Sequence, residues 1–218
     1  MFKATEFADL LLKGDTVKAW KYIESYKSEE ILTIYEEIIT PAMHHIGLLW
    51  ENNKITVADE HIATAVCDFV LSRFSTLQIE SHQGPAPRKR AIFLCLEGEQ
   101  HYLGLKMANF LFIDRGWETK YFGPNLPLEY ALQTAKEWKP DVIGLSVSIV
   151  THLPKLKSYC HQLETTSPSA TIFAGGRLSS KCDLTNHISS NTLVVSDLST
   201  LNDWLKNNQK GEKENAAY

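Results

Sequence analysis

The hydrophobic pattern of this chain changes its period part of the way along, and this change constrains the fold more than any other feature. Over the first 80 residues, apolar side chains recur every three or four positions, as they do in amphipathic helices. From residue 91 onward, short continuous apolar runs alternate with helical patterns, which is typical of a parallel sheet covered by helices. The sequence therefore predicts an α + α/β protein, with a four-helix bundle ahead of a parallel-sheet domain.

The boundaries follow from the same pattern. We expect the bundle at residues 1–80, a linker at 81–90, the sheet domain at 91–208 and a disordered tail at 209–218. Pro41 lies inside a helical pattern, so we expect a kink or a new helix start there. The last helix of the bundle is expected to bury Ile62, Ala65, Val66, Phe69, Val70, Phe74 and Leu77. Strands are expected at residues 91–96, 118–122, 142–146, 171–174 and 193–195.

Composition excludes several classes of protein. The net charge of −4 argues against direct nucleic-acid binding, which usually needs a basic face. No continuous apolar run approaches the roughly 18 residues that cross a bilayer, and the N-terminus does not resemble a signal peptide. The four cysteines are widely spaced, without a C-x-x-C pair. We expect a cytoplasmic protein with reduced thiols and no membrane contact. The sequence contains no nucleophile or hydrolase motif, so we do not expect an enzyme.

Three loops at the expected carboxyl ends of strands carry the candidate chemistry, because ligands of open parallel sheets bind at that edge. The first loop presents His101 with Glu99 two residues before it and Gly104 after it. A neutral imidazole is a good transition-metal ligand, and a carboxylate on its far nitrogen fixes the tautomer. A lone loop histidine is more often an ordinary surface residue, so this pattern alone does not establish a site.

The other two loops are less specific by themselves. Ser146 and Ser148 follow the third strand, where hydroxyls can bind a ligand or satisfy local backbone groups. Gly175 and Gly176 follow the fourth strand, where paired glycines permit a flat group to approach but are also common in plain turns.

Together the three motifs, E-x-H-x-x-G, S-x-S and G-G, closely resemble the cobalamin-binding domain of methionine synthases, mutases and related regulators. The resemblance covers about residues 90 to 208 and implies a Rossmann-like (flavodoxin-like) fold. It implies that His101 is the lower axial cobalt ligand and that Glu99 is its hydrogen-bond partner. The groove for the nucleotide tail would be lined by Gly104, Ser146, Ser148, Gly175 and Gly176. Ser148 stands where the family usually has leucine, and Glu99 replaces the more common aspartate.

The helical half resembles the cap of cobalamin-dependent photoreceptor regulators of the CarH type, which carry W-x9-E-H. Trp50, Glu60 and His61 have this spacing, and Val57 matches a further cap position. The resemblance implies that these residues enclose an adenosyl group on the upper face of the cofactor. Without the motif, Trp50 would be read as a core residue and His61 as a helix-flank residue.

Two departures from the photoreceptors matter. Their cap has a histidine directly after the tryptophan, whereas this chain has Glu51 there, so His44, His45 or water are the remaining upper ligands after photolysis. The chain also begins with the bundle, and we expect no winged-helix DNA-binding domain.

The first functional hypothesis is therefore a stand-alone cobalamin sensor that responds to light or cofactor state and regulates a partner, most plausibly a transcription regulator. It would prefer adenosylcobalamin, with methylcobalamin or hydroxocobalamin as other forms, and could be a homo-oligomer. The alternative is a corrinoid methyl-carrier subunit of a methyltransferase system. A third hypothesis is an interaction module that no longer binds cobalamin.

Overall fold

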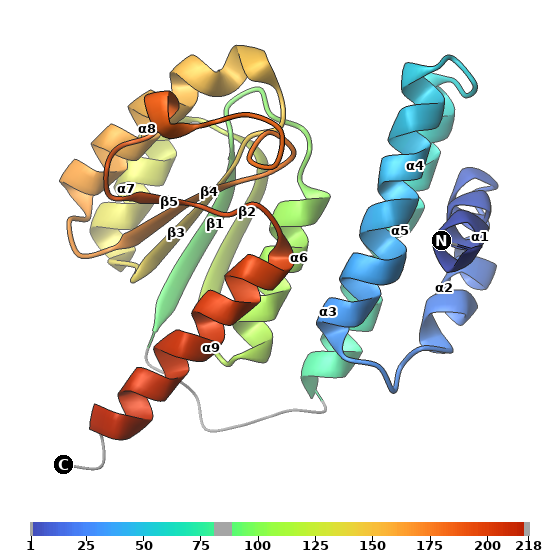
Figure 1. Ribbon diagram of the computed structural model, residues 1–218, viewed down its shortest axis with the longest axis horizontal. Coiled ribbons are helices and arrows are strands. Elements are labelled where there is room, and N and C mark those ends of the chain that lie inside the picture. Colours follow the sequence, from blue (N-terminus) through green and yellow to red (C-terminus); the bar gives the residue numbers. More distant parts are fainter. Residues whose placement is uncertain (1, 81–88, 216–218) are drawn as a thin grey trace. The chain divides into compact units, whose positions relative to one another are not determined.

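The structure, a computed structural model, describes the backbone of residues 2–80 and 89–215. The chain divides into two compact units, residues 1–83 and 84–218, which are described separately here (Figure 1). Most of the expected linker lies outside the described residues. The predicted fold class, a helical region followed by a parallel-sheet domain, is confirmed.

The helical unit begins with two short helices whose ends have clear local causes. α1 (Phe2–Leu12) is followed by Gly14, whose φ of +67° is a left-handed conformation that suits glycine. α2 (Thr16–Glu24) begins after Asp15, whose side chain accepts the backbone N–H of Lys18 at 3.0 Å. Phe7 and Leu11 of α1 and Ile23 of α2 are completely buried in the core of this unit.

The next helical stretch runs from Ile31 to Glu51 and contains a wide turn. α3 (Ile31–Ile34) passes into a π-helical segment, Tyr35–Ile39, and then into α4 (Thr40–Glu51). Pro41 is the second residue of α4. Proline has no N–H to bond the preceding turn, and the π-helical segment directly before it lets the chain start a new α-helix without leaving the helical path. The sequence predicts a kink or a new helix start at Pro41, and the new α-helix starts one residue earlier, at Thr40, without a break in helical conformation.

α5 (Val57–Glu80) is the long central helix, and it is apolar on more than one side. Val66, Val70 and Phe74 are buried, and α5 contacts α1, α2 and α4. The prediction that Ile62, Phe69 and Leu77 also belong to the core is wrong, because these side chains are about half exposed. Ala65 is exposed as well. α1, α2 and α4, the helices that contact α5, cover only part of its circumference.

Residues Val57–Ile79 are long and apolar enough, by length and composition, to cross a membrane. Charged residues such as Asp68 and Arg73 interrupt this segment, so it is not a continuous apolar run of the kind that the sequence analysis considered. The central helix of a helical bundle can have the same length and hydropathy. Val66, Val70 and Phe74 of α5 are buried, as expected of such a helix.

The second unit is a parallel sheet of five strands in the order β2-β1-β3-β4-β5. The strands are β1 (Arg90–Leu96), β2 (Glu118–Leu126), β3 (Val142–Ser146), β4 (Thr171–Gly175) and β5 (Thr192–Val194). The helices are α6 (Leu103–Asp114), α7 (Leu128–Trp138), α8 (Leu153–Thr166) and α9 (Leu198–Asn215). β2 is added on one side of β1, and β3, β4 and β5 are added on its other side. The strand order therefore reverses between β1 and β3, and ligands of such sheets bind at that point.

Two elements run further than the sequence predicts. β2 continues past residue 122 to Leu126, and it includes Pro124, which an edge strand tolerates because one side has no strand partner. α9 continues past residue 207 to Asn215, into the segment expected to be disordered. That segment is rich in lysine, glutamate and glutamine, which favour a helix even where no apolar positions call for one.

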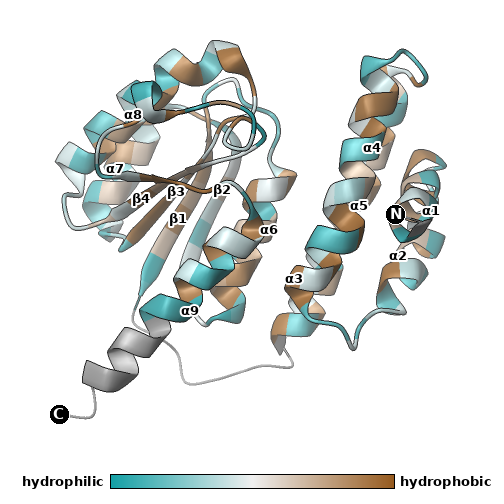
Figure 2. Cartoon of the chain, viewed as in Figure 1, coloured by the Kyte–Doolittle hydropathy of each residue, from teal (hydrophilic) through white to brown (hydrophobic). Residues whose placement is uncertain are grey.

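Alternate residues of β1 face opposite layers of helices, and these helices mix hydrophobic and hydrophilic residues, as amphipathic helices that cover a sheet do (Figure 2). Ile92, Leu94 and Leu96 join the core that α7 and α8 cover. Phe93 lies on the other face, where its ring centroid is 5.0 Å from that of Phe112 in α6. Trp204 of α9 contacts Phe173 of β4 on this face at 4.8 Å between centroids.

Gly144 in β3 makes room for this aromatic layer. It pairs in register with Phe93 of β1 and Phe173 of β4. A Cβ atom on Gly144 would lie 2.6 Å from Cδ1 of Phe93, closer than packed atoms allow.

We expect Gly144→Ala to lower the free energy of unfolding by about 1–3 kcal/mol, because the extra methyl group overpacks the aromatic layer. Urea unfolding followed by tryptophan fluorescence measures this change. The matched control is Gly104→Ala in α6, where an added Cβ meets nothing within 4 Å and alanine favours the helix. Equal destabilisation by both substitutions would contradict the packing argument.

Candidate functional site

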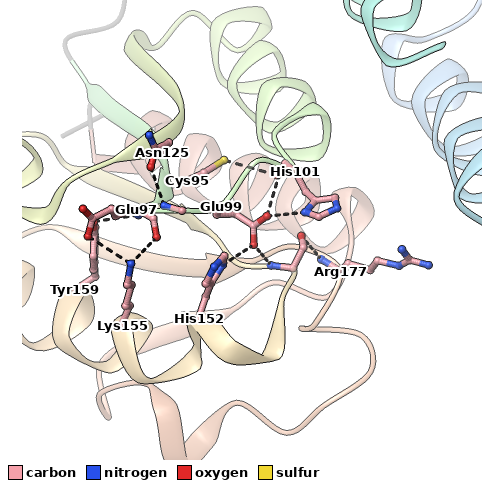
Figure 3. Close-up of polar contacts among 11 residues, drawn as sticks. Cys95, Glu97, Glu99, His101, Asn125, His152, Lys155, Tyr159 and Arg177 are labelled. Atoms are coloured by element: carbon pink, nitrogen blue, oxygen red, sulfur yellow. Dashed lines mark hydrogen bonds and ion pairs between the residues drawn. The ribbon is translucent and has the colours of Figure 1, made fainter. Parts of the chain in front are cut away.

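The predicted site residues of the sheet domain meet where β1 and β3 end side by side (Figure 3). Cys95, Ser146 and Gly175 are register partners across β1, β3 and β4, so the loops that follow these strands start at the same level. This is the carboxyl edge at the point where the strand order reverses.

Glu99 is the centre of the site, although its side chain is completely buried. Its Oε1 accepts hydrogen bonds from the backbone N–H of His101 at 3.0 Å and from Nδ1 of the same residue at 2.6 Å. Its Oε2 accepts the backbone N–H of Ser148 at 2.7 Å and lies 3.3 Å from Nδ1 of His152. A single carboxylate therefore joins the loops after β1 and β3.

A tight turn brings Glu99 back against the edge of the sheet. Gly98 has a φ of +88°, and a Cβ atom there would lie 3.3 Å from Nε2 of His152. The N–H of Gly98 donates to Oδ1 of Asn125 at 2.8 Å, and the N–H of Asn125 donates to the carbonyl of Glu99 at 3.1 Å. The conformation of this loop is thus fixed from both sides of Glu99.

The environment of Glu99 keeps its side chain charged at neutral pH. Burial by itself would raise the pKa of Glu99. The hydrogen bonds from the ring and the backbone of His101 and from the backbone of Ser148 outweigh this effect and lower the pKa to about 2. An anionic carboxylate can only accept hydrogen bonds, so Nδ1 of each neighbouring histidine carries the proton.

His101 has the features of a single metal ligand. Its side chain is 55% exposed, while its Nδ1 is anchored on the buried carboxylate. With the proton on Nδ1, the neutral ring has its lone pair on Nε2, the nitrogen available to a metal. Among residues 2–80 and 89–215, no three histidine, cysteine, aspartate or glutamate side chains are grouped so as to hold a metal ion. The arrangement suits a metal that brings its other ligands with it.

The loops that follow β3 and β4 are hydrogen-bonded to each other. Ser148 Oγ accepts the backbone N–H of Arg177 at 3.3 Å, and the N–H of Val147 donates to the carbonyl of Gly175 at 2.9 Å. Gly176 has a φ of +112°, and a Cβ there would lie 2.4 Å from the carbonyl oxygen of Val147. Gly176 is thus required by the close approach of the two loops, while Ser146 is buried at the end of β3.

Gly104 is in a different environment, in the first turn of α6. A Cβ atom placed there meets nothing within 4 Å. The glycine therefore does not serve packing within the protein, and the space beside it is open to a ligand.

The four predicted residues of the helical unit lie around the turn between α4 and α5. Trp50 precedes the end of α4 and is 48% exposed, so the alternative that it is a core residue is wrong. Val57, the first residue of α5, is exposed as well. In the first turn of α5, Glu60 Oε2 lies 2.9 Å from Nδ1 of His61. Glu60 also accepts a hydrogen bond from Thr64.

Sequence reasoning missed His152 and Asn125 as members of the site. His152 lies in the short 3₁₀ turn Val150–His152 after β3 and is 53 residues from Glu99 in the chain. Asn125 lies in the extension of β2 and has a φ of +58°, which asparagine tolerates better than most residues. The only signal for His152 in the sequence was its place in a loop at the expected ligand edge.

Comparison with known proteins gives matches over both units. Residues 4–74 match one family model described as a B12 binding domain, and residues 89–185 match a second with the same description. The HTH-type transcriptional repressor CarH of Myxococcus xanthus is 29% identical over 116 residues, which is 53% of this chain and 37% of that protein. Dimethylamine corrinoid protein 1 of Methanosarcina acetivorans is 27% identical over 150 residues, covering 67% of this chain and 68% of that protein.

A solved structure has the same fold over nearly the whole chain. The monomethylamine corrinoid protein of Methanosarcina barkeri has a TM-score of 0.76 and covers 92% of this chain and 96% of its own. Its sequence identity is 15%, so this likeness concerns the fold alone.

The buried carboxylate predicts a pH dependence of stability. Glu99 has a pKa of about 2 in the folded protein against 4.5 without its partners, so its contribution is present above pH 4.5 and is lost as the pH falls towards 2. We expect the free energy of unfolding to fall by about 2–3 kcal/mol over that window from this group. Glu99→Gln should flatten the profile there and lower stability at pH 7.

Denaturant unfolding at a series of pH values measures both effects. The matched control is Glu97→Gln, since Glu97 is exposed and its side chain lies 3.4 Å from Lys155 Nζ. This control should keep the profile of the unsubstituted protein. A Glu99→Gln profile parallel to that of Glu97→Gln would show that the carboxylate does not have this role.

Proposed function

We propose that this chain, which carries a two-part B12-binding domain, is a corrinoid carrier that serves a methyltransferase system. The observation that carries the proposal is the histidine anchored on a buried anionic carboxylate at the reversal point of the sheet. A carrier of this kind is not itself a catalyst, because it presents a group to partner proteins that perform the transfer.

The residues of the site fit the lower side of a corrinoid. A corrinoid would bring most of the ligands of its cobalt with it, so the protein would need to contribute a single nitrogen. His101 offers that nitrogen, with its tautomer fixed by Glu99. When bound, the corrinoid supplies a cobalt that accepts and releases a methyl group.

The comparisons favour the carrier over the sensor that the sequence motifs suggested first. The match to the dimethylamine corrinoid protein spans about two thirds of both chains, whereas the match to CarH spans about a third of that repressor. The expectation of a light-responsive partner of a transcription regulator is therefore replaced as the main interpretation.

The proposal assigns roles to the remaining site residues. We propose that the edge of the sheet receives the nucleotide tail along Gly104, Ser146, Ser148, Gly175 and Gly176. The open space beside Gly104 supports this path. The cofactor form we propose is methylcobalamin rather than adenosylcobalamin, and the protein partner is a methyltransferase.

A sensor remains the second candidate, and one observation favours it. Trp50 and Val57 are exposed, and the Glu60–His61 pair lies in the first turn of α5. Their spacing in the sequence is the one that resembles the cap of CarH-type regulators. We propose that these four residues cover the upper face of the cofactor in either function. An indole and a polar pair suit a large adenosyl group, whereas a methyl group needs only an apolar cover.

We expect His101→Ala to lower the affinity for cobalamin by about 10- to 100-fold and to remove the protein nitrogen from cobalt. Electron paramagnetic resonance of the cob(II)alamin complex detects the axial nitrogen, and labelling the protein with ¹⁵N-histidine changes the splitting only if a histidine is bound. His161→Ala on α8 is the matched control, because His161 is exposed and lies on another element. A splitting unaffected by labelling in the unsubstituted protein would overturn histidine ligation.

Affinity for two cobalamins separates carrier from sensor. For a carrier we expect methylcobalamin to bind at least as tightly as adenosylcobalamin, and Trp50→Ala to change their ratio by less than about threefold, because a methyl group contacts little of the indole. Equilibrium titrations in the dark measure the ratio. A preference of tenfold or more for adenosylcobalamin that Trp50→Ala abolishes, together with a spectral change on illumination, would support the sensor instead.

A further inference from the structure

The loop after β4 carries an arginine whose backbone is fixed where two loops meet. The N–H of Arg177 donates to Oγ of Ser148, in the loop after β3, at 3.3 Å. The preceding Gly176 lies so close to Val147 that a Cβ atom there would be 2.4 Å from its carbonyl oxygen. The following Leu178 is buried in the core of the sheet domain. The point from which the Arg177 side chain leaves the loop is therefore determined by its neighbours on both sides.

A serine ties the same turn to the end of β5. The hydroxyl of Ser179 lies 2.7 Å from the carbonyl oxygen of Gly176 and 2.7 Å from that of Val195, the residue after β5. The N–H of Ser179 also donates to the carbonyl of Gly176, at 3.1 Å. The turn that holds Arg177 is thus bonded to the loop after β3 on one side and to the end of β5 on the other.

The Arg177 side chain extends to the same side as the candidate metal ligand. In Figure 3 the guanidinium of Arg177 and the imidazole of His101 both point away from Glu99. Arg177 is partly exposed, so a ligand at this edge of the sheet can reach it. A guanidinium on a fixed backbone suits an anionic group, because its planar fork of N–H donors matches the oxygens of a phosphate or carboxylate.

The proposed cofactor carries such an anion. In a corrinoid with a nucleotide tail, a phosphodiester joins the corrin side to the nucleoside, so along the tail it comes before the base. The proposed path of the tail passes Gly175 and Gly176, and Arg177 follows this pair directly. A tail on this path brings its phosphodiester to the loop that holds the guanidinium.

A second cation at this edge serves a contact within the protein. Nζ of Lys155 donates to the carbonyl of Glu97 at 3.0 Å and lies 3.4 Å from the carboxylate of the same residue. Lys155 belongs to α8, and it joins that helix to the loop after β1. It does not lie on the loop of the glycine pair, so the position along the proposed tail path favours Arg177.

From this geometry we propose that Arg177 binds the phosphodiester of the nucleotide tail and makes the site selective for corrinoids that carry the nucleotide. The inference rests on the proposed function, since it concerns the cofactor of the same site. It assigns a role to a charged residue that follows the glycine pair and that the motif itself does not include.

Three corrinoids separate the phosphate from the rest of the tail. Methylcobalamin carries phosphate, ribose and base, methylcobinamide phosphate keeps the phosphate without ribose and base, and methylcobinamide lacks all of these. Equilibrium dialysis of the full-length apoprotein in the dark, followed by corrin absorbance, measures the affinity for each. Every comparison is made between protein variants for one corrinoid, so differences among the free corrinoids cancel.

We expect Arg177→Gln to lower the affinity for methylcobalamin and for methylcobinamide phosphate by about 5- to 30-fold, because the charge-assisted hydrogen bonds are lost. Its affinity for methylcobinamide should change by less than about twofold. Arg177→Lys should recover part of the loss, since it keeps the charge without the planar fork. The matched control is Lys181→Gln, because Lys181 is exposed and lies in the same loop, and this variant should bind all three corrinoids as the unsubstituted protein does.

Salt dependence tests the same contact without a substitution. Added potassium chloride screens a pair of charges at a partly exposed site. In the unsubstituted protein it should therefore weaken the affinity for methylcobalamin more than that for methylcobinamide. This comparison decides the question if circular dichroism shows that Arg177→Gln is not folded.

The outcomes distinguish this inference from the proposed function. An unchanged affinity of Arg177→Gln for methylcobalamin overturns the role of Arg177 and leaves the carrier proposal intact. An equal loss of affinity for all three corrinoids also overturns it, because a purely structural role would affect methylcobinamide as well. The same holds for equal salt dependence of methylcobalamin and methylcobinamide binding. Failure of the unsubstituted protein to bind any of the three corrinoids overturns the proposed function itself.

Discussion

The sheet domain depends on one buried negative charge. A carboxylate without water is stable only if protein donors replace the solvent, and Glu99 has them on both oxygens. The donors come from its own loop and from the loop after β3, which lies about 50 residues further along the chain. Displacing the loop after β3 would leave Oε2 of Glu99 without its donors. The two loops are therefore held together by the same group that orients the candidate metal ligand.

The parallel sheet brings the loops that carry Glu99, Ser148 and Gly176 to the same edge. In a parallel sheet all carboxyl ends lie at one edge, and the register of Cys95, Ser146 and Gly175 makes three of them end together. Glycines then allow contacts that side chains would prevent. Gly144 admits the ring of Phe93 within the sheet, and Gly176 admits the carbonyl of Val147 at the edge. Ser148 joins the second loop to the third through Arg177.

Local pattern and spacing were sufficient for the architecture and for half of the site. The helix and strand periods predicted both regions, and the two-residue separation of Glu99 and His101 made their contact foreseeable within one loop. His152 was not foreseeable in the same way, since its contact with Glu99 depends on the order of strands rather than on sequence distance. The exposure of Phe69 and Leu77 was also missed. Helical periodicity identifies apolar positions but does not tell how many neighbours a central helix has.

The lower side of the site does not by itself distinguish a carrier from a sensor. An imidazole on an anionic carboxylate serves any function in which cobalt keeps one protein ligand while its other axial position changes. The distinction must therefore come from residues outside this site, and the proposal above assigns it to the cap motif of the helical unit. There, Trp50 and Val57 expose apolar surface beside the Glu60–His61 pair. A methyl group would contact little of the Trp50 indole, whereas a nucleoside would contact much of it. The contribution of Trp50 to cobalamin affinity therefore separates the two functions better than any property of His101.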